Sequence, residues 1–155
     1  MPYQPVVDSD IAFFKTIIGP DQVLVDAESR QRYGRDETEN LVFPPEVVLK
    51  PSTTEEISAI MKHCNQRCIP VTPRGAGTGL SGGALPHLGG VSLSMERLNR
   101  ILQIDERNLQ VTVEPGVITE VLQNAVKEKG LFYPPDPSSR GSCFIGGNIA
   151  ENSGG

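Results

Sequence analysis

A run of small residues at positions 74–84 offers the clearest chemistry in this sequence. It consists of Arg74, Gly75, Ala76, Gly77, Thr78, Gly79, Leu80, Ser81, Gly82, Gly83 and Ala84. Glycine reaches positive φ angles and has no side chain that keeps a ligand away from the backbone. Successive N–H groups in such a loop can converge on an anion, and phosphate suits them well. Arg74, at the entrance, can add positive charge or hold the loop by hydrogen bonds.

Three familiar phosphate-binding loops fit this run poorly. Gly77, Gly79 and Gly82 have the spacing of the dinucleotide fingerprint, but that fingerprint requires a helix directly afterwards, and residues 83–90 are poor helix formers. A Walker A loop requires a lysine followed by Ser or Thr after its last glycine, and this run has none. A kinase glycine loop requires a lysine on the following strand, which is also missing. A glycine-rich surface turn without a ligand stays open as an alternative.

A second run of small residues lies near the end of the sequence. Gly141 and Ser142, then Gly146, Gly147 and Asn148, again offer exposed backbone amides. We expect Gly146 and Gly147 at a helix N-terminus, where N–H groups and the helix dipole favour an anion. Two such segments in one short chain predict a ligand with an extended phosphate group held between them. A pyrophosphate dinucleotide meets that description, although spacing alone does not say which one.

Alternating short helices and strands must position these two runs. Thr53 and Glu56 predict a capping box at the start of a helix. Gly130 predicts a C-terminal cap at the end of another helix. A strand, a helix and a strand in succession before the first run indicate an α/β unit. The pattern predicts helices over residues 10–18, 27–33, 53–67 and about 121–126, a helix beginning at 149, and strands over 47–49, 69–72, 91–94, 101–105 and 109–114.

Composition narrows the class of protein. The chain has 155 residues, which fits one domain, with 37% hydrophobic and 21% charged residues, as in globular proteins. Its apolar runs are far shorter than the roughly 20 residues of a spanning helix, and its first residues do not resemble a signal peptide. A net charge of −5 with 5% aromatic residues argues against nucleic-acid binding. Three cysteines without an export signal predict reduced thiols in the cytoplasm.

Two of the cysteines lie close together, beside a histidine. Cys64 and Cys68 next to His63 could form part of a metal site. The alternative is that both line the buried side of a helix, because the apolar residues before them, Ile57, Ile60 and Met61, follow helical spacing. We favour the second interpretation and expect no metal. Both His63 and His87 are expected to be ordinary surface residues.

The two runs together resemble the FAD-linked oxidases of the p-cresol methylhydroxylase and vanillyl-alcohol oxidase fold. Residues 73–84 are similar to the first flavin-binding loop of that family, and residues 134–139 with 143–155 are similar to the second. The combination is most similar to the FAD-linked component of glycolate oxidase and the related D-lactate dehydrogenases. D-2-hydroxyglutarate dehydrogenases are also similar.

The resemblance implies a fold and a place within a longer enzyme. It implies an α+β FAD-binding domain of the p-cresol methylhydroxylase type, with two small α/β subdomains of which the second is incomplete. Residues 1–155 would be the N-terminal portion, lacking the substrate cap and the C-terminal catalytic regions. We therefore expect no catalytic residue in this portion, no activity from it alone, and weak FAD binding or none when it is alone.

The resemblance also implies a cofactor and its contacts. Some relatives attach FAD covalently through a histidine, but the matching position here is Thr78, so non-covalent FAD is expected. The implied contacts are Arg74, Gly75, Ala76, Gly77, Thr78 and Gly79 for the pyrophosphate, Pro135, Asp136 and Ser139 beside the flavin, Gly141, Ser142, Ile145, Gly146, Gly147 and Asn148 for the pyrophosphate and ribityl chain, and Asn152 as a support for the second loop.

The implied reaction is oxidation of a small 2-hydroxy acid, of glycolate or D-lactate type, to a 2-oxo acid. Other oxidase subunits are expected partners, and could bring a cytoplasmic enzyme to a membrane surface. An enzyme similar to UDP-N-acetylenolpyruvoylglucosamine reductase is one alternative, although the second run fits it less well. A non-catalytic flavin- or nucleotide-binding module is another, and a structural domain with ligand-free glycine loops is a third.

Overall fold

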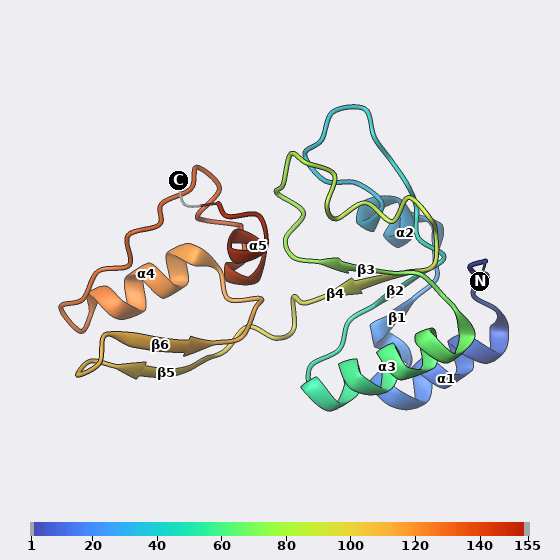
Figure 1. Ribbon diagram of the computed structural model, residues 1–155, viewed down its shortest axis with the longest axis horizontal. Coiled ribbons are helices and arrows are strands. Elements are labelled where there is room, and N and C mark those ends of the chain that lie inside the picture. The colour runs from blue at the N-terminus through green and yellow to red at the C-terminus, as the bar shows by residue number, and fades with distance from the viewer. Residues whose placement is uncertain (1, 154–155) are drawn as a thin grey trace.

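The structure, a computed structural model, describes residues 2–153 and contains two units side by side (Figure 1). The first unit contains a four-stranded sheet with three α-helices, and the second a two-stranded sheet with two α-helices. This mixed arrangement agrees with the predicted α+β class. No helix within residues 2–153 is long and apolar enough to cross a membrane.

A largely parallel sheet forms the centre of the first unit. Its strands are β1 (Val23–Leu24), β2 (Val47–Leu49), β3 (Val71–Arg74) and β4 (Val91–Ser94), in the order β1-β2-β4-β3. β2 and β3 both run parallel to β4, and β1 is antiparallel to β2. All residues of β2 and β4 are buried, as expected of parallel strands covered on both faces. The glycine-rich run therefore leaves the sheet at the end of β3.

Helices cover both sides of this sheet. α1 (Asp8–Ile18) and α3 (Thr54–Arg67) lie together below the sheet in Figure 1, and α2 (Ala27–Tyr33) lies above it. A short 3-10 helix, Pro20–Gln22, joins α1 to β1. The core includes Phe14 of α1 and Ile60 and Cys64 of α3. Hydrophobic burial by these helices fixes the sheet, and with it the start of the glycine-rich run.

The N-terminus of α3 shows half of the predicted capping box. The Thr53 hydroxyl accepts a hydrogen bond from the Glu56 N–H at 3.1 Å, as predicted. The Glu56 carboxylate, however, accepts from the Ser52 N–H at 2.6 Å, so the reciprocal bond is made one residue earlier. Among the residues predicted on the buried side of α3, Met61 is exposed.

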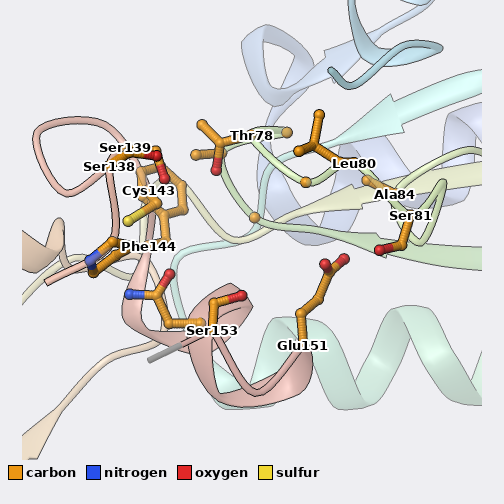
Figure 2. Close-up of a pocket in the computed structure, with 17 residues that line it drawn as sticks. Thr78, Leu80, Ser81, Ala84, Ser138, Ser139, Cys143, Phe144, Glu151 and Ser153 are labelled. Carbon is orange, nitrogen blue, oxygen red and sulfur yellow. The ribbon is translucent and has the colours of Figure 1, made fainter. Parts of the chain in front are cut away.

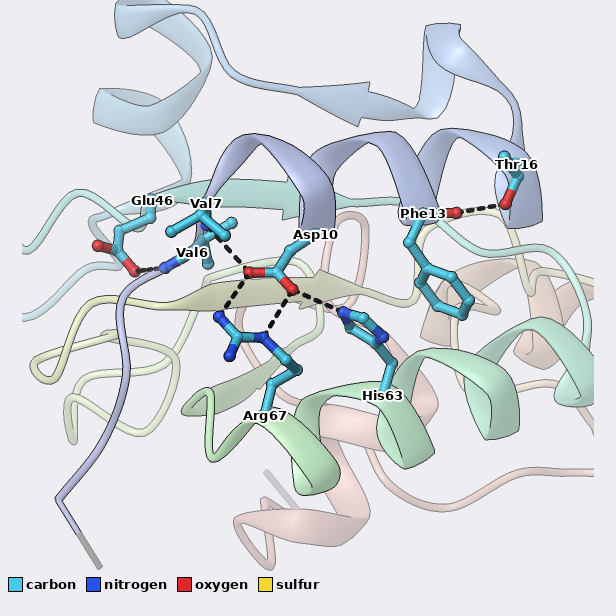
Figure 3. Close-up of polar contacts among 8 residues, drawn as sticks. All are labelled: Val6, Val7, Asp10, Phe13, Thr16, Glu46, His63 and Arg67. Atoms are coloured by element: carbon cyan, nitrogen blue, oxygen red, sulfur yellow. Dashed lines mark hydrogen bonds and ion pairs between the residues drawn. The ribbon is translucent and has the colours of Figure 1, made fainter.

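A buried carboxylate joins α1 to α3 (Figure 3). Asp10 is 1% exposed, and its carboxylate contacts His63 Nε2 at 2.8 Å and accepts from Arg67 Nε at 3.1 Å. Burial opposes ionisation of Asp10, but hydrogen bonds from Arg67, the Val7 N–H and His63 together lower its pKa. The His63 ring also stacks on Phe13, with centroids 4.2 Å apart. His63 thus belongs to this contact rather than to an ordinary surface.

The second unit packs a hairpin against a helix. β5 (Ile101–Asp105) and β6 (Gln110–Val113) are antiparallel, and α4 (Thr119–Lys127) covers them. The short helix α5 (Ile145–Ala150) completes the unit, with Ile145 in a core that contains Val117, Leu122 and Val126. Gly130, with φ of +71°, ends the turn after α4. The second small-residue run is therefore anchored by this second core.

Several predicted boundaries are wrong. α1 begins at Asp8 rather than at residue 10, and α4 covers Thr119–Lys127 rather than about 121–126. Tertiary contacts explain the differences at β3 and α5. β3 runs from Val71 to Arg74 rather than over 69–72, because it pairs with β4 as far as Ser94. Its Pro73 is tolerated because β3 is an edge strand. α5 begins at Ile145 rather than at 149, because burial of Ile145 stabilises a helix that its glycines disfavour.

Candidate functional site

A cavity of about 460 Å³ lies where the two units meet (Figure 2). The first unit contributes Gly75, Ala76, Gly77, Thr78, Gly79, Leu80, Ser81 and Ala84. The second unit contributes Pro137, Ser138, Ser139, Cys143, Phe144, Gly147, Asn148, Glu151 and Ser153. Figure 2 shows the labelled side chains of the two groups on opposite sides of the opening. The cavity is thus built from the two small-residue runs singled out in the sequence.

The two runs approach each other closely. A Cβ atom on Gly75 would lie 3.9 Å from Cα of Gly147, so the backbones come almost into contact. Gly77 and Gly147 line the same cavity, rather than opposite sides of the molecule. One ligand lying in this cavity can therefore reach both runs.

The first run presents an open row of backbone donors. No N–H group from Gly75 to Ser81 donates a hydrogen bond to another group within residues 2–153. The next N–H group, that of Gly82, donates to Thr38 Oγ1 at 2.9 Å. Gly77 has φ of +78°, a conformation that glycine adopts without strain. This row has the character of an anion-binding nest.

Cationic side chains do not line this cavity. Within the described part of the chain, its lining includes no Lys, Arg or His, and Glu151 supplies a carboxylate. The other polar side chains available are the hydroxyls of Thr78, Ser81, Ser138, Ser139 and Ser153 and the amide of Asn148. Recognition of a phosphate by these residues would therefore rest on N–H and O–H donors, not on ion pairs.

Arg74 is turned away from the cavity. Its side chain is 8% exposed, and Nη1 donates to the carbonyl of Arg35 at 2.7 Å. The guanidinium lies over the Tyr33 ring, 5.3 Å from its centroid. Burial lowers the pKa of Arg74 from its ordinary value. Of the two roles considered for Arg74, the structure shows hydrogen bonds that hold the start of the loop.

A polar network continues from Arg74 behind the loop. The Tyr33 hydroxyl donates to Glu96 Oε2 at 2.6 Å, and Glu96 also pairs with Lys50. Burial, followed by the hydrogen bond and charge of Glu96, raises the pKa of Tyr33 to about 12. Tyr33 therefore stays a neutral donor over the physiological range. Tyr33, Arg74 and Glu96 also line a smaller adjoining pocket of about 240 Å³.

The start of α5 offers fewer donors than predicted. The Ile145 and Gly146 N–H groups already donate to the carbonyls of Val117 and Pro115, both at 2.9 Å. In the first turn, the Gly147 N–H has no partner among residues 2–153. Gly146 and Gly147 do lie in the first turn of a helix, as predicted. Gly147, rather than the whole helix end, is the donor that faces the cavity.

Asn148 is held by a residue that the sequence analysis did not identify. Its Nδ2 donates to Thr119 Oγ1 at 2.6 Å, and both residues are buried. The Thr119 N–H in turn donates to the Cys143 carbonyl at 3.1 Å. The amide of Asn148 is therefore fixed, with its Oδ1 end left to accept. Thr119 carries no local sequence signal, because its partners lie more than twenty residues away.

Some of the remaining predicted residues line the cavity or an adjoining pocket, and others make contacts within the protein. Ser139 lines the cavity, while Ser142 and Gly146 line adjoining pockets. Asp136, in contrast, forms an ion pair with Arg140 at 3.2 Å, and Ile145 is in the core. Outside the lining of the main cavity lie Arg74, Pro135, Asp136, Gly141, Ser142, Ile145, Gly146 and Asn152.

Several lining residues were not predicted to contact a ligand. They are Leu80, Ser81, Ala84, Pro137, Ser138, Cys143, Phe144, Glu151 and Ser153. Each lies within one of the small-residue runs or within five residues of it in the sequence, so proximity to the glycines was the available signal. Figure 2 shows Glu151 pointing across the opening towards the first run. Its Oε1 would lie 3.0 Å from a Cβ on Gly79, so a side chain at that position would require the Glu151 carboxylate to shift slightly.

These features define a class of protein: a two-unit α+β domain that binds a phosphate-containing dinucleotide in a cleft lined by backbone amides. The sequence model of the FAD binding domain family matches residues 45–155. The chain belongs to this family. The open N–H row fits the diphosphate of FAD, the cofactor of the family. A Cβ on Gly147, which lines the same cavity, would meet no protein atom within 4 Å, so the space beside it is free for a ligand.

Relatives and solved structures support the same fold. Glycolate oxidase subunit GlcD of Bacillus subtilis is 48% identical over 139 residues, which are 90% of this chain and 30% of that protein. D-lactate dehydrogenase of Anaerostipes hadrus is 41% identical over 156 residues, covering 99% of this chain and 32% of that protein. A structure of p-cresol methylhydroxylase with bound substrate superimposes with a TM-score of 0.71 and 26% identity, over 86% of this chain and 29% of the other. The resemblance inferred from the two runs is therefore confirmed.

Proposed function

We propose that this chain is the FAD-binding part of an enzyme that oxidises a small 2-hydroxy acid to a 2-oxo acid. The open row of N–H groups from Gly75 to Ser81, facing Gly147 across one cavity, is the observation that carries the proposal. The names of the relatives, glycolate oxidase and D-lactate dehydrogenase, support the substrate class. The chain spans about 30% of the length of these relatives, so the reaction belongs to the whole enzyme.

The protein residues would bind and orient the cofactor. The N–H groups of the first run would donate to the diphosphate, and Gly147 would donate from the other side of the cavity. Thr78 and Ser139 would add hydroxyl donors, and the fixed amide of Asn148 would accept from a ligand hydroxyl or N–H. FAD, when bound, supplies the acceptance of hydride from the substrate. Arg74 would act by holding the loop.

The proposal also covers the place of this domain in the enzyme, the linkage to FAD, the location and the partners. We place residues 1–155 as the N-terminal portion of the enzyme, with substrate-binding and catalytic groups in other parts. FAD would be bound without a covalent link, because Thr78 lies in the loop where some family members carry a linking histidine. A cytoplasmic location and association with other oxidase subunits belong to the same proposal. The name of the Bacillus subtilis relative, a glycolate oxidase subunit, supports the latter.

Reduction of the bound flavin by candidate substrates tests this function. The full-length gene product would be purified with its flavin and mixed without oxygen with glycolate, D-lactate, D-2-hydroxyglutarate or L-lactate. We expect the absorption band of oxidised flavin to bleach with at least one of the first three acids and more slowly with L-lactate. A flavin that none of these acids reduces, yet that dithionite reduces, would contradict the proposed substrate class.

A further inference from the structure

Residues 34–45 form a strap that lies against the glycine-rich run. This segment connects α2 to β2, and in Figure 1 it rises beside the loop that follows β3. The Glu37 N–H donates to the Gly79 carbonyl at 3.1 Å. The Gly82 N–H donates to Thr38 Oγ1 at 2.9 Å. Two adjacent strap residues therefore hold the two sides of a short bend in the glycine-rich run.

The strap is itself tied to the first unit. The Phe43 N–H donates to the Gly34 carbonyl at 2.7 Å, which closes the base of the strap. A Cβ on Gly34 would lie only 2.7 Å from the Phe43 carbonyl oxygen, so glycine is required there. Arg30 Nε donates to the Pro45 carbonyl at 2.6 Å at one end, and Arg74 donates to the Arg35 carbonyl at the other. The strap can therefore act as a support for the glycine-rich run.

The Thr38 contact lies at the end of the open donor row. The N–H groups from Gly75 to Ser81 make no bond within residues 2–153, so they do not themselves hold the loop in shape. Gly82, with φ of +73°, turns the backbone directly after that row, and its N–H is fixed by the Thr38 hydroxyl. A loop already held in its bound shape loses less conformational entropy when a ligand binds. Residues 34–44 lie outside the part of the chain that matches the family model.

We propose that Thr38 is a positioning residue for the cofactor site, acting through its hydrogen bond to Gly82. This inference rests on the proposed binding of FAD, and adds to it an element contributed by the strap. The Thr38 hydroxyl does not line the cavity and would not touch the ligand. Its effect would be to keep the row of N–H groups curved towards the second unit before the ligand arrives.

A set of single substitutions in the full-length gene product tests this proposal. Thr38→Val keeps the side-chain shape and removes the acceptor, while Thr38→Ser keeps the acceptor. Thr16→Val is the matched control, because Thr16 Oγ1 donates to the Phe13 carbonyl at 2.7 Å on α1, away from the cavity. We expect Thr38→Val to weaken FAD binding about tenfold, the order expected when a partly buried donor loses its partner, and the other two to bind like the wild type.

Hydrogen exchange without FAD gives a second, independent measurement. In Thr38→Val, peptides that contain residues 75–82 should exchange faster than in the wild type, whereas peptides from α1 should not change. If Thr38→Val binds FAD as tightly as the wild type, or if Thr16→Val weakens binding equally, the proposal is wrong. If the folded wild type binds no FAD, the proposed function fails and the positioning role with it, even where loop exchange responds to Thr38→Val.

Discussion

Gly77 shows at the scale of one residue why the first run needs glycine. Its φ is +78°, and a Cβ there would clash with Nη2 of Arg74. Backbone conformation and the space taken by the buried guanidinium therefore exclude a side chain at the same position. The two constraints act together, because Arg74 must occupy that space to reach the Arg35 carbonyl.

A comparison of Gly77→Ala with Gly19→Ala separates the effect of backbone conformation from that of the contact with Arg74. Gly19 also has a positive φ, +83°, but a Cβ there would meet nothing within 4 Å. We expect both substitutions to lower the free energy of unfolding by about 1 kcal/mol through backbone strain. Only Gly77→Ala should also weaken FAD binding, by about tenfold or more, because Arg74 and the loop must move.

Chemical denaturation and FAD titration of both variants would measure these two effects. Equal FAD affinity for Gly77→Ala and the wild type would show that the loop does not depend on the packing of Arg74 against Gly77. A loss of FAD affinity in Gly19→Ala would show that general destabilisation, rather than the local clash, accounts for the effect.

The glycines could be predicted from the sequence, but their supports could not. Gly75, Gly77 and Gly147 were identified because glycine itself signals unusual backbone conformations and close approach. Thr38 and Thr119 were not identified, because their contacts with Gly82 and Asn148 join residues 44 and 29 positions apart. The direction of the Arg74 side chain likewise depends on the distant Tyr33 and Arg35.

At the scale of elements, α1 and α3 are joined by the buried carboxylate of Asp10 (Figure 3). Because the pKa of Asp10 is lowered in the folded state, its ionisation stabilises the fold above the unfolded pKa. That stabilisation is lost as pH falls through the lowered folded value. The pH range concerned lies below the ordinary value of 3.8.

Asp10→Asn tests this contact, with Asp8→Asn in the same helical turn as the control. We expect Asp10→Asn to lower the free energy of unfolding at neutral pH by about 2 kcal/mol, because the contacts of Arg67 and His63 with a charged carboxylate are lost, while Arg67 stays partly exposed to solvent. The deficit should shrink as pH falls below 3.8, since the wild type then loses the same interaction. Denaturation curves across pH would measure it, and a deficit that does not change with pH would contradict the electrostatic explanation.

Element boundaries were predictable where local signals agreed with packing. α2, β2, β4 and β5 begin and end at the predicted residues. In β2 and β4 the short apolar runs coincide with fully buried positions, and Asp26 caps the start of α2. α5 was placed four residues too late, since glycines at 146 and 147 argue against a helix locally. The buried Ile145 and the hydrogen-bonded Asn148 outweigh that local preference.

At the scale of the whole molecule, the cavity exists only because two separately cored units meet. The first unit presents the open row of N–H groups and the second presents Gly147 and Asn148. Sequence motifs indicated that the two runs share a ligand, whereas the absence of Lys, Arg and His from the described lining became visible only in three dimensions. Recognition of FAD by main-chain donors from both units is therefore the central claim.

A crystal structure of the full-length gene product with FAD would test that claim most directly. We predict that diphosphate oxygens lie about 3 Å from N–H groups within the Gly75–Ser81 row, and that Gly147 contacts the same FAD molecule. A diphosphate bound elsewhere, or one that contacts only one of the two runs, would contradict it.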